Sequence, residues 1–185
     1  MLVEQPAQAP VRVLLDGVGA GELSDDLLDG LRAAGRPPLQ VHAQDFWRPA
    51  GERFAWGRMD EQAFRSHWLD AGALEREVLS ACAAGCYLPA LWDVAADRSA
   101  RRRVEPVPPG AVLLVDGVLL LDRGLPAELT VHLALSTAAL RRRGVPDWQL
   151  PVLAAYDRQA RPGEVCDVLV RAEDPLRPAV LVRRR

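Results

Sequence analysis

The sequence predicts an α/β fold, a three-layer sandwich in which helices cover both faces of a parallel sheet. Three observations indicate this class. Segments of strand composition alternate with segments of helical spacing along most of the chain. Residues 112–115 are continuously apolar, as expected of a strand buried on both faces of a parallel sheet. The first apolar segment also leads through a glycine-rich turn directly into a helical segment.

The N-terminal part of the chain predicts two strands with a helix between them. Residues 11–15 are expected to form the first strand, and residues 16–21 the glycine-rich turn. Ser24 is the expected N-cap of the helix that follows, and Gly35 and Pro37 end it. A second strand is expected over residues 39–43, followed by an irregular stretch rich in arginine and tryptophan.

The remaining elements continue the alternation. Helices are expected at 61–68, 73–84, 138–143 and 148–156, and strands at 87–92, 104–107, 112–115, 130–135, 167–170 and 180–182. A length of 185 residues suits one domain. We therefore expect residues 1–10 to be an N-terminal lead, a segment that precedes the fold, and residues 11–185 to form a single domain.

Composition excludes several classes of function. The 23 basic and 25 acidic residues give a net charge of −2, so no positive field is available for a nucleic-acid backbone. All the basic residues are arginines, which excludes chemistry that needs a lysine amine. The longest apolar run, 111–121, is interrupted by Asp116 and Gly117 and is too short to span a membrane.

The three cysteines, Cys82, Cys86 and Cys166, are expected to be reduced and buried. Together with an N-terminus that lacks a signal-peptide pattern, they indicate a cytoplasmic protein. No further ligands follow at zinc spacing, so no metal site is expected.

Five segments, in chain order, resemble bacterial uridine kinase-like P-loop proteins, which are related to phosphoribulokinase. They are DGVGAGELS (16–24), AQDFWRP (43–49), LWDVAADR (91–98), LLVDGVLLL (113–121) and CDVLVRAEDPLRP (166–178). The resemblance implies a P-loop NTPase fold of the nucleoside-kinase type, with a ligand crevice at the carboxyl ends of the strands. A fold alone does not establish kinase activity.

The glycine-rich loop departs from the P-loop pattern G-x-x-x-x-G-K-[ST]. Without a gap, Glu22 replaces the second glycine and Leu23 the lysine; with one residue deleted, Glu22 itself takes the lysine position. Either alignment lacks the cation that binds phosphate. The degenerate phosphate loop comprises Gly17, Gly19, Gly21, Glu22 and Ser24. We expect Glu22 to lie at the helix N-terminus, where an anion would otherwise bind.

Two more departures concern the parts that the resemblance assigns to phosphoryl transfer. Gln44 stands where the family has the carboxylate that accepts the substrate proton, and an amide cannot act as a general base. The lid expected between Leu140 and Tyr156 looks shortened, and residues 141–143, three arginines, are interpreted as a solvated helix face. Ordinary ATP-dependent phosphotransfer is therefore not expected. ATP and magnesium are expected only if the protein is a kinase after all.

Carboxylates are expected to line the crevice instead. Asp16 ends the first strand, Asp45 follows the second, and Asp116 ends the buried strand. Two carboxylates in a partly dry cleft shift each other's pKa values apart, which provides an acid and a base near neutral pH. These three residues are the predicted catalytic groups.

The predicted substrate pocket is aromatic and basic. Its candidate residues are Gln44, Trp47, Arg48, Trp56, Arg58, His67 and Trp92. Asp97 stands where the resemblance implies the base-reading histidine, which argues against uridine as the substrate. Trp68, His42 and His132 are interpreted as buried structural residues.

These features favour a repurposed, ATP-independent enzyme with carboxylate acid/base chemistry. A cyclisation, dehydration or isomerisation of an apolar or aromatic biosynthetic intermediate would suit such a site. Two alternatives stay open: a non-catalytic pseudokinase that binds a ligand or a partner subunit, and a true kinase in which arginines replace the P-loop lysine. A homodimer is compatible with each of them.

Overall fold

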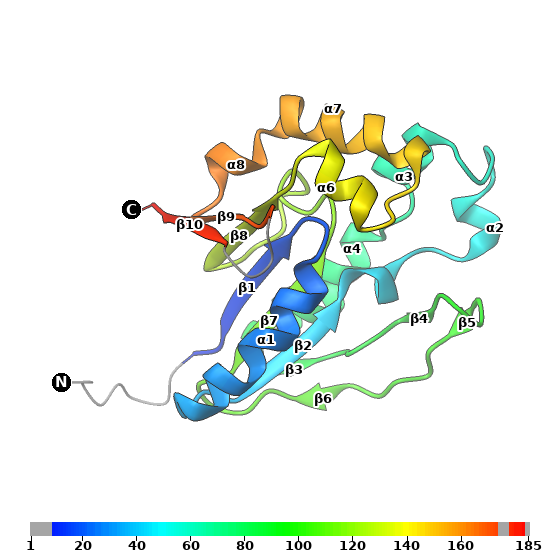
Figure 1. Ribbon diagram of the computed structural model, residues 1–185. Coiled ribbons are helices and arrows are strands. Elements are labelled where there is room, and N and C mark those ends of the chain that lie inside the picture. Colours follow the sequence, from blue (N-terminus) through cyan, green and yellow to red (C-terminus); the bar gives the residue numbers. More distant parts are fainter. Residues whose placement is uncertain (1–8, 174–177, 184–185) are drawn as a thin grey trace.

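The computed structural model describes residues 9–173 and 178–183, and in these residues a six-stranded sheet carries helices on both faces (Figure 1). The strand order is β10-β9-β8-β1-β7-β2. The parallel strands are β1 (Val11–Asp16), β2 (Pro38–His42), β7 (Val112–Gly117), β8 (Leu129–Ala134) and β9 (Val168–Arg171). Only β10 (Ala179–Val182) is antiparallel, at one edge. The predicted α/β sandwich is therefore confirmed.

Strand β7 lies inside the sheet, with β1 on one side and β2 on the other. Leu113 and Val115 are 0% exposed, as a strand covered on both faces requires. The register pairs Asp16 with Gly117 and His42 with Asp116. The polar residues that end β1, β2 and β7 consequently meet at one edge of the sheet.

Helix α1 (Ala20–Ala33) covers one face of the sheet. It begins immediately after Gly19, whose φ of 91° is a left-handed conformation that glycine adopts without strain. The prediction that Ser24 caps this helix is wrong, because the glycine turn at Gly19 allows the helix to start five residues earlier. Ser24 is buried within the helix, and its hydroxyl accepts a hydrogen bond from Gln40 Nε2 at 3.0 Å.

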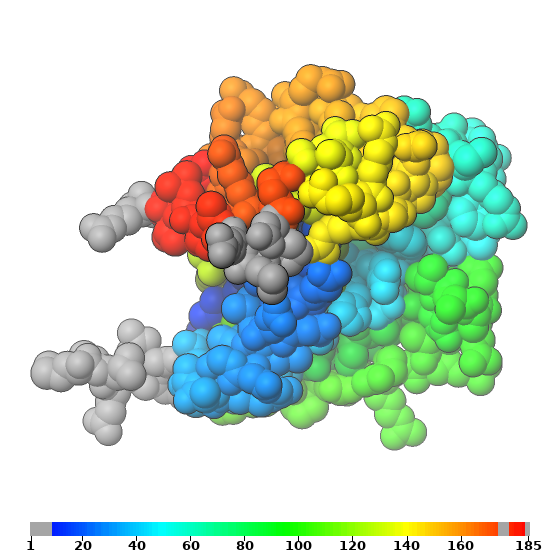
Figure 2. All heavy atoms as spheres, in the orientation of Figure 1, coloured from blue at the N-terminus to red at the C-terminus, as the bar shows by residue number. Residues whose placement is uncertain are grey.

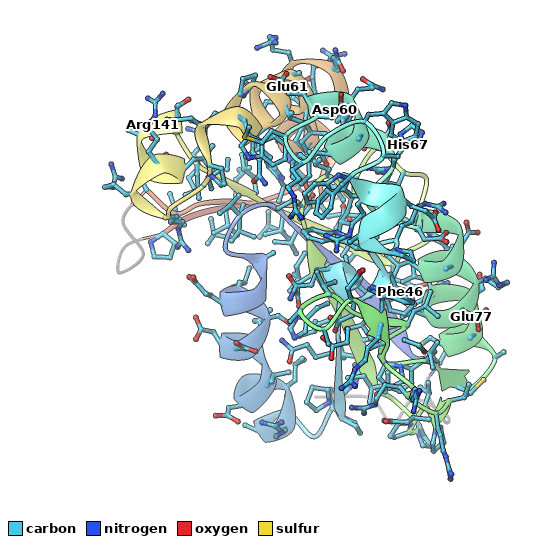
Figure 3. The ribbon with its side chains drawn as sticks, turned by 90° about the vertical axis from the view of Figure 1, so that its right-hand side faces the viewer. Phe46, Asp60, Glu61, His67, Glu77 and Arg141 are labelled. Atoms are coloured by element: carbon cyan, nitrogen blue, oxygen red, sulfur yellow. The ribbon has the colours of Figure 1, made fainter. Side chains whose placement is uncertain are left out.

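A second helical layer covers the opposite face (Figure 3). It consists of α4 (Ala71–Leu74), a π-helical segment η2 (Glu75–Ser80) and α5 (Ala81–Ala83), where the sequence predicts one helix at 73–84. Asp70 caps the segment by accepting from the Ala73 backbone N–H at 3.0 Å. The side chains it buries against β1, β2 and β7 include Leu74, Val78, Leu79 and Cys82, all 0% exposed.

The remaining elements connect the strands of the sheet, and α7 (Leu150–Ala160) and α8 (Pro162–Val165) lie beside β8, β9 and β10 in Figure 1. The other helical ones are η1 (Ala43–Phe46), α2 (Ala50–Arg53), α3 (Glu61–Ser66), α6 (Thr137–Arg142) and η3 (Asp147–Gln149). Two short antiparallel pairs are β3 (Cys86–Tyr87) with β6 (Glu105–Pro106), and β4 (Trp92–Asp93) with β5 (Arg98–Ser99). The predicted strands 87–92 and 104–107 are thus much shorter than expected.

Among the residues that the structure describes, no helix has the length and apolar character needed to cross a membrane. Most of the predicted lead, residues 1–8, lies outside the described residues, as do residues 174–177 of the fifth resembling segment and residues 184–185.

An arginine lies inside the aromatic cluster between α2 and α3. Arg53 is 4% exposed, and its guanidinium lies 5.6, 4.9 and 5.4 Å from the ring centroids of Trp47, Phe54 and Trp68. Its Nε donates to the Arg48 carbonyl at 2.7 Å. Trp68 is 7% exposed, which confirms its interpretation as a core residue. The cluster fixes the position of Trp47, one of the cavity residues described below.

Candidate functional site

A cavity of about 450 Å³ opens at the carboxyl ends of β1, β2 and β7. It lies between the loop that begins α1 and the segment that joins α6 to α7. Its polar side chains are His42, Gln44, Asp116, Arg143 and Gln149, and its apolar ones include Trp47, Phe64, Leu69, Val118, Val145 and Pro146. The lining therefore offers both polar groups and apolar surface to a ligand.

His42 and Asp116 form a hydrogen-bonded pair at the cavity wall. His42 Nδ1 lies 2.9 Å from Asp116 Oδ2 and 3.0 Å from Oδ1. With the carboxylate as acceptor, Nδ1 carries the proton and Nε2 is the ring nitrogen left for other partners. The side chain of His42 is 41% exposed, whereas that of Asp116 is 8% exposed. The prediction that His42 is a buried structural residue is therefore wrong.

The surroundings shift the pKa values of this pair. Burial acts to lower the pKa of His42, but the hydrogen bond and charge of Asp116, aided by Asp45 and Asp25, raise it overall. Burial raises the pKa of Asp116, partly offset by the hydrogen bond from His42. Burial also raises the pKa of Asp45, which the charge of Asp116 reinforces. The pKa of the imidazole is thus raised above its usual value, which favours the charged form of the ring.

A cation reaches the glycine-rich loop at residues 16–21 from a distant part of the chain. Arg143 follows α6, and its Nη1 donates to Glu22 Oε2 at 2.7 Å. The guanidinium lies directly on Gly19, where a Cβ atom would be 2.9 Å from Nη1. In Figure 2, α6 and the loop that follows it (yellow) meet the N-terminal end of α1 (blue). The loop therefore holds an ion pair rather than a free positive charge.

The arginine cluster at residues 141–143 divides in two. The side chains of Arg141 and Arg142 are each 62% exposed, as the interpretation of a solvated face expects. Arg141 extends from the outer side of α6 (Figure 3). Arg143 is 21% exposed and departs from that interpretation, because the end of α6 turns it toward the loop.

Asp16 lies outside the cavity lining and is 0% exposed. Its Oδ1 accepts from the Leu120 backbone N–H at 2.8 Å. Its Oδ2 accepts from His132 Nδ1 and from the Tyr156 hydroxyl, each at 2.8 Å. His132 is 5% exposed, which confirms its interpretation as a buried structural residue. With three donors around it, Asp16 joins β1, β8 and α7.

Some of the predicted site residues line the cavity and others lie outside it. Asp116, Gln44, Trp47 and the loop glycines Gly17, Gly19 and Gly21 line the cavity. Asp45 is half-buried in η1 beside this lining, and Glu22 is exposed at the edge of the loop.

The other predicted substrate-binding residues are absent from the cavity lining. Trp56 is 63% exposed and its ring contacts that of His67 in a tilted arrangement, with ring centroids 4.8 Å apart. Arg48 pairs with Glu52 at 3.4 Å, and Arg58 lies over the Phe54 ring. Trp92 Nε1 donates to Asp97 at 3.1 Å. Figure 3 shows His67 on the outer side of α3.

Sequence reasoning missed His42, Phe64, Arg143 and Gln149. For His42 a usable signal existed: it lies in the predicted strand 39–43, two residues before Gln44, so alternation along an extended chain would put both side chains on one face. Arg143 gave no such signal, since neither composition nor spacing tells which of three consecutive arginines turns inward.

In the described residues, no group of three or more His, Cys, Asp or Glu side chains is arranged to hold a metal ion. The site can bind a small molecule, pair an anionic group with Arg143, and move a proton at His42. These capacities follow from the cavity itself.

Comparison with known proteins supports the fold. No family model matches the sequence, and no curated protein matches it. A possible uridine kinase from Bacillus stearothermophilus matches the structure with a TM-score of 0.70 at 16% identity, over 91% of each chain. Phosphoribulokinase from Rhodobacter spheroides matches with a TM-score of 0.57 at 13% identity, over 90% of this chain and 71% of that one. The chain has the fold of P-loop kinases, as the five sequence segments predict.

Proposed function

We propose that the chain is a small-molecule enzyme that works without ATP and uses His42 and Asp116 as its acid–base pair. The observation that carries the proposal is the hydrogen bond at 2.9 Å between these two residues on the wall of a cavity of about 450 Å³. The expected substrate has an apolar or aromatic body, because Trp47, Phe64 and Leu69 are among the residues that line the cavity.

In this reaction His42 Nε2 removes a proton from the bound substrate. Asp116 holds the imidazole through Nδ1 and stabilises the imidazolium that forms. The same nitrogen then returns the proton to a second position on the substrate or to a leaving hydroxyl group. An isomerisation, a cyclisation or a dehydration can each proceed by such a transfer.

This proposal differs from the sequence-based prediction, in which three carboxylates are the catalytic groups. Asp116 remains in the site as the partner of His42, and Asp45 lies close enough to raise the pKa of that histidine. Asp16 accepts three hydrogen bonds outside the cavity lining, so we assign it no role in proton transfer.

The residues at the loop do not fit magnesium-ATP. The chain has no lysine, and Glu22 pairs with Arg143, whose guanidinium lies on the loop. Ser24, the hydroxyl of the P-loop pattern, is 0% exposed and accepts from Gln40. A carboxylate about 4 Å from a phosphate oxygen would oppose binding by about 4 kcal/mol per unit charge at an effective dielectric near 20. No step of the proposed reaction passes through a nucleotide.

Turnover of a screened ligand tests the proposal. Ligand-observed NMR on a library of aromatic and apolar metabolites identifies binders, which are then incubated with the protein in the absence of nucleotide. We expect conversion of at least one binder by the wild type, with kcat lower by about 10²–10⁴-fold in His42→Gln and Asp116→Asn. His67→Gln, an exposed histidine outside the cavity lining, is the matched control and should retain activity.

Three results would contradict the proposal. These are conversion only when magnesium-ATP is added, equal conversion by His42→Gln, and binding without conversion of any ligand. The last result would favour the pseudokinase alternative.

The position of Arg143 favours one second candidate, a kinase in which this arginine replaces the P-loop lysine. Its guanidinium lies on Gly19, within the loop that corresponds to the phosphate loop. A kinase predicts that millimolar magnesium-ATP raises the melting temperature and that Arg143→Gln abolishes the increase. The ATP-independent enzyme predicts no increase in either protein.

A further inference from the structure

Arg143 is the single Lys or Arg side chain among the described residues that line the cavity. Its place is well defined: Gly19 lies beneath the guanidinium, and the Arg143 backbone N–H donates to the Ala139 carbonyl at the end of α6 at 3.0 Å. A ligand in the cavity that carries negative charge has this cation as its partner.

The charges around the cavity suit a single negative charge on the ligand. Asp116 lies in the lining, and Glu22 is paired with Arg143. Together these two carboxylates already outnumber the one arginine, although a protonated His42 can restore the balance. A polyphosphate or a dianion would leave the cavity with excess negative charge, whereas a monoanion can exchange with Glu22 without changing the total.

Glu22 shows which anion this arginine accepts. Its carboxylate receives a hydrogen bond of 2.7 Å from Nη1, and no other side-chain partner of Arg143 is present in the described residues. A guanidinium has five N–H donors in a planar fork that matches a carboxylate with two parallel hydrogen bonds. The Glu22 side chain is 72% exposed, so a ligand carboxylate can displace it into water.

The apolar residues of the cavity lining determine which uncharged group the ligand can carry. Trp47, Phe64, Leu69, Val118 and Pro146 give the lining an apolar section able to receive a ring or a short hydrocarbon chain. An amphipathic molecule with one charged end would therefore use both parts of the lining.

The geometry points to an aromatic or aliphatic monocarboxylate as the ligand, with its carboxylate bound to Arg143 in place of Glu22. This inference rests on the proposed function for the use of the cavity, and it names the substrate class.

Titrations with matched probes test it. The probes are benzoate, phenylacetate and 3-phenylpropionate, the neutral amide of each, phenyl phosphate and ATP, and the readout is protein-observed NMR at a pH where His42 is neutral. We expect at least one carboxylate to bind, and to bind about ten-fold more tightly than its amide, phenyl phosphate or ATP.

Variants then assign the contact. Arg143→Gln should weaken carboxylate binding by about ten- to a hundred-fold through loss of a charge-assisted hydrogen bond. Glu22→Gln should strengthen it by about two- to five-fold, because the competing carboxylate is gone. Arg142→Gln, at the last residue of α6 and with a side chain that is 62% exposed, is the control and should bind as the wild type does. Circular dichroism and melting curves verify that each variant is folded.

Any of three results would overturn the inference: tighter binding of phenyl phosphate or ATP than of every carboxylate, unchanged carboxylate binding in folded Arg143→Gln, or weaker binding in Glu22→Gln. The proposed catalysis is tested separately, because turnover of the screened ligands by wild type and His42→Gln is a different measurement from carboxylate binding to Arg143. Carboxylate binding without any turnover would therefore refute the enzyme and leave the ligand class intact.

Discussion

Replacing Tyr156 by phenylalanine tests whether Asp16 is held as a structural acceptor. The Tyr156 hydroxyl donates to Asp16 Oδ2 at 2.8 Å and accepts from the Leu121 backbone N–H at 3.0 Å. Asp16 is 0% and Tyr156 2% exposed. Burial, reinforced by the negative charge of Asp16, raises the pKa of Tyr156, so the hydroxyl keeps its proton and remains a donor.

The magnitude follows from the two lost contacts. A hydrogen bond to a charged acceptor contributes about 1.5–3 kcal/mol, and a buried N–H without a partner costs about 1–3 kcal/mol. Asp16 keeps its bonds from Leu120 and His132, and a water molecule entering the space would recover part of the loss. We expect the free energy of unfolding to fall by roughly 2–4 kcal/mol. For a chain of this length, that corresponds to roughly 4–16 °C in melting temperature.

Urea unfolding followed by tryptophan fluorescence measures the loss, with the m-value as a check that only stability has changed. The control is Tyr87→Phe. Tyr87 is the other tyrosine of the chain, and its hydroxyl donates to the half-buried Glu105 at 3.2 Å. The control variant should lose about 1.5 kcal/mol or less, because this bond is longer, the Glu105 side chain is 42% exposed and also pairs with Arg102, and no backbone N–H loses its partner. Equal losses in the two variants would refute the assignment of Asp16 to a structural network.

Two further predictions concern the loop and the proposed acid–base pair. Gly19→Ala should destabilise the protein by about 1–3 kcal/mol, because residue 19 has a φ of +91° and the new Cβ would lie 2.9 Å from Arg143 Nη1. Gly51→Ala, where nothing lies within 4 Å, is its control in urea unfolding, and equal losses would speak against the close contact. Because the pKa of His42 is raised above its usual 6.5, the stabilisation from its charged pairing with Asp116 is complete below pH 6.5 and is lost as pH rises through the folded-state pKa. The stability difference between wild type and His42→Gln should therefore shrink over that range of pH, and a difference that grows would contradict the pairing.

The sheet was predictable because its strands carry strong local signals. The apolar run at 112–115 became β7, and the glycine-rich turn after the first strand became the start of α1. The boundaries were less predictable. Ser24 has the chemistry of an N-cap, but the left-handed Gly19 begins the helix earlier, and local preference for Ser24 does not reveal that.

The site was predictable only in part, because it depends on which strands are neighbours. Asp116 and Gln44 follow from the segments that resemble known proteins, and both line the cavity. His42 joins them because β2 pairs with β7 in a register that places His42 beside Asp116. Arg143 reaches Glu22 from 121 residues away. Contacts of this kind arise from tertiary structure, and periodicity and composition do not predict which distant residue a given side chain contacts.

The charge state and tautomer of His42 provide the most direct test of the acid–base pair. Long-range ¹H–¹⁵N correlation spectra of the histidine rings, recorded over a range of pH for wild type and Asp116→Asn, report both, with the exposed His67 as the internal reference. We predict that neutral His42 carries its proton on Nδ1 and that its pKa falls in Asp116→Asn. A neutral ring protonated on Nε2, or a titration that Asp116→Asn leaves unchanged, would contradict the proposed acid–base pair.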